Sequence, residues 1–245
     1  MVSSTGVRQR GPSGAPIWTT HTVDAERNRV YVTTGENTSH HTTITSDAVI
    51  ALDLNTGEEI WVFQALENDM WNFACSGREP GPNCIILEDT NAVDFDFGGP
   101  AILVDTGDRE LLIAGQKSGD LWALDPDTGA LVWNQRIGEG TALGGNHWGV
   151  ATDSERVFMT INDPGGLGRS SRPGLYTYFA RTGESSWYYE VDPDCGDHRS
   201  DRIRNCEARS GFSATPLSVD GAVITAGLDG RLFIFDSDSG ELLFE

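Results

Sequence analysis

Short apolar runs follow one another along the chain, and glycine, proline, aspartate and threonine interrupt them every eight to twelve residues. Short runs separated in this way are typical of β-strands and turns, and no long segment carries apolar residues at the three- and four-residue spacing of a helix. The stretches LLIAGQKSGDLWALD (111–125) and AVITAGLDGRLFIFD (222–236) each hold a glycine turn between apolar runs. Both predict β-hairpins, and the whole pattern predicts an all-β protein.

One phrase recurs along the chain and has the form strand, tight turn, strand. In each copy a turn glycine is followed four positions later by tryptophan or phenylalanine. We therefore expect four-stranded antiparallel blades in a β-propeller, with the repeated tryptophan docking one blade onto the next. The copies are ALDLNTGEEIW (51–61), ALDPDTGALVW (123–133), YFARTGESSW (178–187) and IFDSDSGELLF (234–244).

The repeat predicts about four to five blades within one domain over residues 1–245. The last copy stops where its outer strand should continue. We interpret the chain as a partial propeller domain of a larger ring, and a short closed propeller is the alternative.

The formal net charge of the chain is −20 at pH 7. Such a surface repels nucleic acid and anionic membranes, and arginines do not cluster with aromatic residues. No apolar run approaches the roughly 18–20 residues that a membrane-spanning helix needs. We expect neither a nucleic-acid partner nor insertion into a membrane.

The four cysteines form two local pairs, Cys75 with Cys84 and Cys195 with Cys206. Each pair closes a short polar loop, which indicates two disulfides and an oxidising compartment. Free surface thiols are the alternative. The spacing does not match a zinc knuckle.

Lys117, in GQKSGDLWALD (115–125), is the only lysine among the 17 lysines and arginines of the chain. An ammonium is a compact cation that can meet a single oxygen, whereas a guanidinium forks onto two. Lys117 is therefore either an ordinary surface lysine or a position that needs a point charge.

The repeat and GQKSGDLWALD together resemble the quinoprotein alcohol dehydrogenases, eight-bladed propellers that use pyrroloquinoline quinone (PQQ) with calcium. SGAPIWTTHTVD, VYVTTGEN, DMWNFAC, DFDFGGP and GGNHWG look most like the polyvinyl alcohol dehydrogenase branch. The resemblance implies oxidation of an alcohol substrate, including polymeric or secondary alcohols, by a periplasmic or secreted protein. A separate acceptor such as cytochrome c would take the electrons, since the chain has no haem-attachment motif.

In this family a tryptophan forms the floor beneath the quinone, and Trp18 matches it. Its indole can stack on the cofactor, and packing between blades is the alternative role. Lys117 matches the basic residue aimed at the reactive quinone oxygen, where an ammonium would stabilise the negative charge that forms on reduction. GGNHWG resembles a segment near the axial opening, so His147 or Trp148 either borders the substrate channel or packs.

The calcium site departs from the family pattern at two positions. Glu36, followed by Asn37, stands where the family usually has a calcium-binding asparagine, and Asn72 stands at its catalytic aspartate. An amide cannot accept the proton of an alcohol. One interpretation is a compensated site, in which Glu36 and the Asn72 carbonyl bind calcium and Glu36, or else Asp69, is the base. The other is that oxidation is lost and the protein only binds.

The competing hypothesis is a non-catalytic β-propeller, a scaffold or binding protein of the outer-membrane assembly type. It would use the same docking repeat around an empty axis. Such a protein would need neither Lys117 nor the acidic turn at Glu36.

Overall fold

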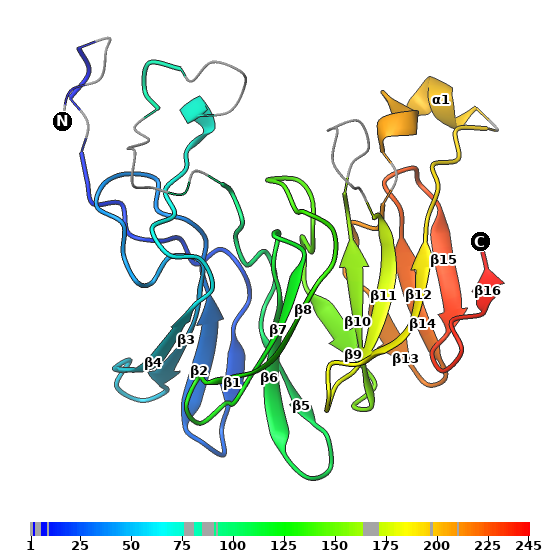
Figure 1. Cartoon of the computed structure of the whole chain (residues 1–245), viewed down its shortest axis with the longest axis horizontal. Helices are drawn as coiled ribbons and strands as arrows, with labels where there is room; N and C mark the ends of the chain where they lie inside the picture. Colours follow the sequence, from blue (N-terminus) through cyan, green and yellow to red (C-terminus); the bar gives the residue numbers. More distant parts are fainter. Residues whose placement is uncertain are drawn as a thin grey trace. The chain divides into compact units, whose positions relative to one another are not determined.

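The computed structural model confirms that the protein is built from β-strands (Figure 1). Among the residues that it describes, sixteen strands form four antiparallel sheets of four strands each. The chain divides into two compact units, Met1–Phe97 and Gly98–Glu245. The structure describes residues 2, 6–8, 10–75, 81–84, 91, 93–163, 172–196, 198–209 and 211–245.

The first unit contains one sheet with the strand order β1-β2-β3-β4. Its strands are β1 (Thr22–Asp24), β2 (Arg29–Thr33), β3 (Ala48–Asp53) and β4 (Glu59–Gln64). The apolar start of β3, AVIA, is fully buried, as expected of a strand covered on both faces. The connection between β2 and β3, residues 34–47, is rich in polar residues, and most of them are buried or partly buried.

The second unit contains three sheets that follow one another along the chain (Figure 1). β9, in the middle sheet, contacts β5 and β13, the first strands of the other two sheets. The predicted hairpins are confirmed as β6 with β7 and β14 with β15. The strands are β5 (Ile102–Asp105), β6 (Glu110–Gly115), β7 (Asp120–Leu124), β8 (Leu131–Arg136), β9 (Val150–Thr152), β10 (Arg156–Ile161), β11 (Gly174–Phe179), β12 (Ser185–Glu190), β13 (Leu217–Val219), β14 (Ala222–Ala226), β15 (Leu232–Asp236) and β16 (Leu242–Phe244).

The repeated tryptophan docks one sheet onto the next in the second unit, as the sequence predicts. Trp133 Nε1 on β8 donates to the carbonyl of Ala180 at 3.0 Å, and its ring lies against Gly183. Trp187 repeats this contact with Gly240 and donates to the carbonyl of Ser237 at 2.9 Å. Both glycines have a φ of about +73°, so the turn needs glycine for its backbone as well as for the indole above it.

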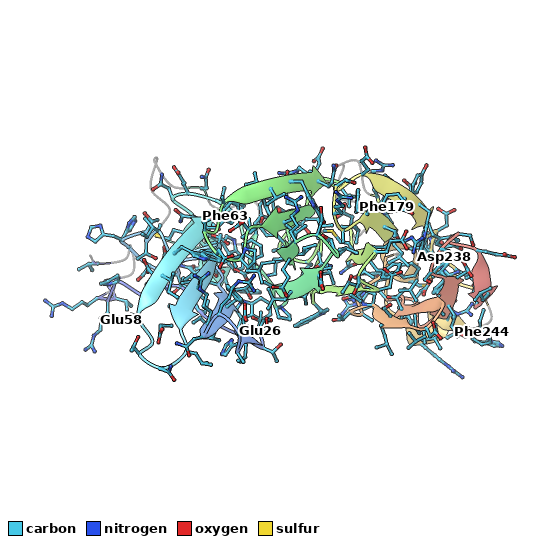
Figure 2. The ribbon with its side chains drawn as sticks, turned by 90° about the horizontal axis from the view of Figure 1, so that it is seen from below. Glu26, Glu58, Phe63, Phe179, Asp238 and Phe244 are labelled. Atoms are coloured by element: carbon cyan, nitrogen blue, oxygen red, sulfur yellow. A yellow bond between two sulfur atoms is a disulfide. The ribbon has the colours of Figure 1, made fainter. Side chains whose placement is uncertain are left out.

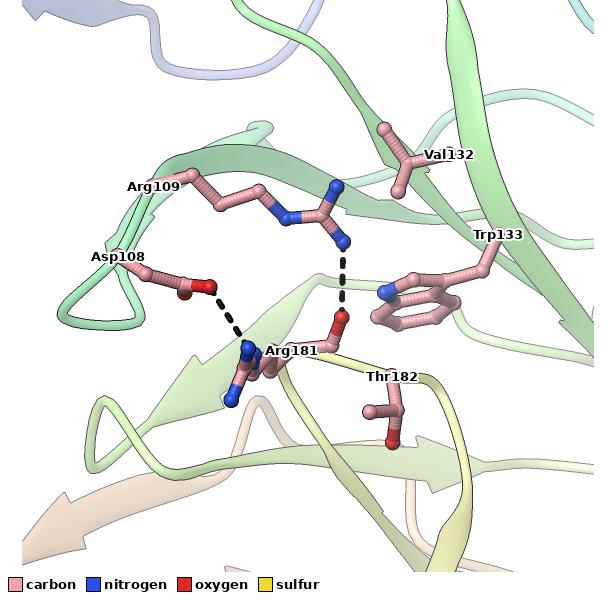
Figure 3. Close-up of a pocket in the computed structure, with 6 residues that line it drawn as sticks. All are labelled: Asp108, Arg109, Val132, Trp133, Arg181 and Thr182. Atoms are coloured by element: carbon pink, nitrogen blue, oxygen red, sulfur yellow. Dashed lines mark hydrogen bonds and ion pairs between the residues drawn. The ribbon is translucent and has the colours of Figure 1, made fainter.

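Ion pairs at the sheet edges reinforce these docking contacts. Arg181 pairs with Asp108 at 2.8 Å, and Arg109 donates to the Arg181 carbonyl at 3.0 Å, beside Trp133 (Figure 3). These bonds tie the β11–β12 turn to the β5–β6 turn. The surface pocket in Figure 3 is therefore lined by residues that join two neighbouring sheets.

Arg156 on β10 joins the third sheet to the fourth. Its guanidinium pairs with Asp238 at 2.9 Å and lies 5.9 Å from the ring centre of Phe179. Phe179 and Asp238 are labelled in Figure 2. Arg156 is largely buried, but the Asp238 side chain is 78% exposed, so solvent screens this ion pair and its contribution to stability is small.

Both predicted disulfides are confirmed, Cys75–Cys84 and Cys195–Cys206. The first follows the short 3-10 helix η1 (Phe73–Cys75), and the second closes a loop with α1 (Arg199–Arg202) and η2 (Cys206–Ala208). Within the described residues, no helix has the length and apolar character needed to cross a bilayer.

Replacing Gly183 with alanine tests the docking contact. The new Cβ would lie 2.7 Å from Trp133 Cδ2, and alanine is strained at this positive φ, so we expect a loss of about 2–5 kcal/mol in unfolding free energy. Gly221→Ala is the matched control, because its φ is +75° and its Cβ would meet open space. It should lose only the backbone part, about 1–2 kcal/mol. Equal losses in denaturant unfolding of both variants would contradict the docking role.

Candidate active site

Three carboxylates gather in the first unit: Glu36, Asp94 and Asp96. One oxygen from each lies within 4.8 Å of those of the other two. Two backbone contacts build this cluster. Glu36 N–H donates to Asp96 Oδ1 at 2.9 Å, and Phe97 N–H donates to the Thr34 carbonyl at 3.2 Å. The segment that carries the two aspartates is thus fastened to the end of β2.

Gly35 lets these groups approach. A Cβ at this position would overlap Asp96 Oδ1 and would lie 3.2 Å from Trp18 Nε1. The indole nitrogen of Trp18 is therefore beside the acid cluster. Trp18 is 38% exposed, so part of the residue is accessible to a ligand.

The pKa of Glu36 is raised to about 9. Burial is the largest cause, and the hydrogen bond and charge of the neighbouring Asp96 carboxyl add to it. Glu36 is 7% exposed and Asp96 6%. Low polarity disfavours a charged carboxylate, and a second negative charge nearby adds repulsion. A bound cation would remove both penalties, since it would neutralise the cluster.

A second acidic pair lies in the same unit and is fully buried: Asp47 and Asp69. Burial and the charge of Asp69 raise the pKa of Asp47 to about 10. Burial also raises the pKa of Asp69, to about 7, although a hydrogen bond from Asp47 acts to lower it. No N–H or hydroxyl of the described residues donates to either Asp47 oxygen or to Asp69 Oδ2. A proton held by Asp47 and shared with Asp69 supplies the hydrogen bond that the pair lacks.

Asp69 and Asn72 belong to a segment that is bonded both to the residue after Glu36 and to a residue shortly before Asp94. Trp71 N–H donates to the Asn37 carbonyl, and Met70 N–H donates to the Asn91 carbonyl, each at 2.9 Å. Asn72 Oδ1, the atom predicted to bind calcium, accepts from Ala74 N–H at 3.0 Å at the start of η1. Asp69 is also outside the group of three carboxylates among the described residues.

Asn37, directly after Glu36, is fully buried and organises the loop before β3. Its Oδ1 accepts from Thr43 N–H at 2.8 Å, and its Nδ2 donates to Thr43 Oγ1 at 3.2 Å. The amide thus holds the loop closed next to the cluster.

Lys117 belongs to the second unit and lies in the turn between β6 and β7. Only 5% of it is exposed, so it is not an ordinary surface lysine. In the same unit, the rings of His147 and Trp148 lie 4.8 Å apart, and Trp148 is 48% exposed.

Sequence reasoning missed Asp94, Asp96 and Asp47. The first two lie in DFDFGGP, where two aspartates alternate with phenylalanine in an apolar setting. Buried acids at such positions are candidates for function, and this signal was present in the sequence. Their meeting with Glu36 depends on a contact across about 60 residues, which no local pattern reveals.

Two family models match the chain. The β-propeller domain of glucose, ethanol and alcohol dehydrogenases matches residues 3–77, and the outer membrane protein assembly factor BamB matches residues 46–245. Polyvinylalcohol dehydrogenase of Sphingopyxis sp. (strain 113P3) is 32% identical over 249 residues, covering 100% of this chain and 37% of that protein. The chain belongs to the family of PQQ-dependent alcohol dehydrogenases.

Solved structures agree with the β-propeller fold. The quinohemoprotein alcohol dehydrogenase from Comamonas testosteroni superposes with a TM-score of 0.61 at 17% identity, covering 94% of this chain and 40% of that one. BamB from Moraxella catarrhalis gives 0.56 at 19% identity, covering 95% and 50%. At these identities the likeness shows the fold alone. The chain spans 37% of the length of its polyvinylalcohol dehydrogenase relative.

The buried acids predict an unusual pH dependence of stability. The folded chain holds protons on Glu36, Asp47 and Asp69 well above the pH at which the unfolded chain releases them. Without a cation, the free energy of unfolding should therefore fall as pH rises from about 5 to 9. Asp47→Asn should make this slope smaller in denaturant unfolding with a chelator.

Asp53→Asn is the control, because backbone N–H groups lower the pKa of Asp53 at the end of β3. It should leave the slope between pH 5 and 9 as in the wild type. A wild-type stability that rises over this range would contradict the assignment of protonated buried acids.

Proposed function

We propose that the chain is part of an enzyme that oxidises an alcohol with PQQ and a calcium ion. The main support for this proposal is the cluster of Glu36, Asp94 and Asp96 beside Trp18, in a chain 32% identical to a polyvinylalcohol dehydrogenase. A secondary or polymeric alcohol is the proposed substrate. An external acceptor such as cytochrome c would receive the electrons.

The donor set fits a hard cation. Calcium prefers several oxygen ligands, and carboxylates supply them with compensating charge. Glu36, Asp94 and Asp96 would hold the ion. Asn72, the ligand proposed from sequence, would bind through Oδ1, which already accepts from Ala74 N–H and would offer the ion its second lone pair.

The chain also offers groups suited to a flat, anionic cofactor. Trp18, which is 38% exposed, would stack on it, and Lys117 would stabilise negative charge on a quinone oxygen. A bound quinone would supply the hydride acceptor for alcohol oxidation, and a bound cation would supply Lewis-acid polarisation.

A carboxylate of the cluster would take the hydroxyl proton as the carbonyl product forms. Glu36 is the base proposed from sequence, and Asp94 and Asp96 are the candidates that geometry adds. A base works best when its pKa is close to the working pH, and the pKa of Asp69, the second base considered from sequence, is raised to about 7. Asp69 is, however, fully buried, paired with Asp47 and outside the group of three carboxylates, so it suits the role less well.

A scaffold of the BamB type is the second candidate, because that family model matches residues 46–245. The dehydrogenase model, by contrast, matches the region with Trp18 and Glu36. These side chains are not part of the docking repeat and favour the enzyme. Two disulfides favour a periplasmic or secreted location.

Titration with PQQ tests the proposed function. In the presence of calcium, PQQ should quench tryptophan fluorescence, because energy passes from Trp18 to the stacked quinone, and a chelator should weaken the effect. Trp18→Phe should remove most of the quenching. Lys117→Arg should weaken PQQ binding by about tenfold, or about 1.4 kcal/mol.

Arg109→Lys is the matched control for the cation exchange, since Arg109 bonds the Arg181 carbonyl at a sheet edge. It should bind PQQ as the wild type does. A folded chain whose fluorescence does not respond to PQQ would contradict the proposal and favour the scaffold.

A further inference from the structure

The turn that carries Lys117 is closed by its own hairpin. Gln116 N–H donates to the Asp120 carbonyl and Gly119 N–H to the Gln116 carbonyl, both at 2.9 Å. These bonds fix the backbone of the turn. They do not determine where the buried Lys117 side chain is directed, because neighbouring segments pack on the turn as well.

A glycine-rich segment from residues 144–146 packs directly on this turn. A Cβ at Gly145 would overlap the carbonyl of Lys117 and would lie 2.7 Å from Gly119 N. Asn146 N–H donates to the Gln116 carbonyl at 3.1 Å. The backbone of Lys117 thus rests on Gly145 with no space for a side chain between them.

The same segment is anchored to the third sheet. Asn146 is fully buried, and its Nδ2 donates to the carbonyls of Gly149 and Thr160 at 2.9 and 3.0 Å. Gly145 N–H donates to Asp163 Oδ1 at 3.0 Å. Thr160 lies on β10, so these bonds fix the segment to the sheet that follows Lys117.

We propose that Gly145 and Asn146 are positioning residues that set the location of the Lys117 ammonium. Through them, the third sheet holds the β6–β7 turn in place. The inference rests on the proposed role of Lys117 at the quinone. Its chemical reason is that a hydrogen bond to a developing charge weakens steeply when the donor moves.

Lys117 is the only lysine in the chain, so isotope-labelled lysine gives one set of side-chain NMR signals. In Gly145→Ala the Lys117 backbone must shift, and its ε-methylene signal should move. Gly107→Ala is the control, because Gly107 also has a positive φ and its Cβ would meet open space. It should leave the lysine signal unchanged.

PQQ affinity gives the second readout. Gly145→Ala should bind PQQ about tenfold more weakly, and Gly107→Ala should bind as the wild type does. If Gly145→Ala fails to fold, Asn146→Ala removes the anchor to Thr160 without adding an atom, and it should give the same two changes.

An unchanged lysine signal in folded Gly145→Ala or Asn146→Ala would overturn the positioning role, whatever PQQ does. The signal needs no cofactor, so this result is separable from failure of the proposed function. If the signal moves as expected but Lys117→Ala binds PQQ as tightly as the wild type, the positioning stands and the proposed role of Lys117 at the quinone is overturned.

Discussion

Repulsion among buried carboxylates is the constraint on which the first unit depends. Glu36, Asp94 and Asp96 share one small region, and burial together with the neighbouring Asp96 carboxyl makes the negative charge of Glu36 costly. The fold nevertheless brings them together through the bond from Glu36 N–H to Asp96 and the absence of a side chain at Gly35. Protons can neutralise the cluster, and a divalent cation can do so while keeping all three groups ionised. The arrangement is therefore understandable as a cation site.

Local sequence patterns predicted much of the fold. The repeated phrase gave the strands, the turn glycines and the docking of Trp133 and Trp187, because each depends on residues a few positions apart. The two disulfides were also local. The partial-ring interpretation stays a prediction.

The candidate site was predicted only in part. Trp18 and Glu36 were chosen by resemblance, and the structure places both at the cluster. Asp94 and Asp96 were not chosen, because their partner Glu36 lies some 60 residues earlier in the chain. Local sequence also gave no sign that Asn72 Oδ1 would accept from Ala74 N–H.

The docking repeat does not separate an enzyme from a scaffold, since both kinds of propeller need it. The separating features are polar groups outside the repeat. A cluster of buried carboxyl groups carries an energetic cost, which a bound cation would offset. The proposed enzyme gives a reason for such a cluster, whereas the docking of propeller blades does not need it.

Calorimetric titration of the chain with calcium tests the central claim most directly. The wild type should bind one ion. Glu36→Gln and Asp96→Asn should each weaken binding at least about tenfold, and Asp53→Asn, at an exposed turn, should not. Calcium binding that is absent from the folded wild type, or equal in all four proteins, would contradict a cation site at Glu36, Asp94 and Asp96.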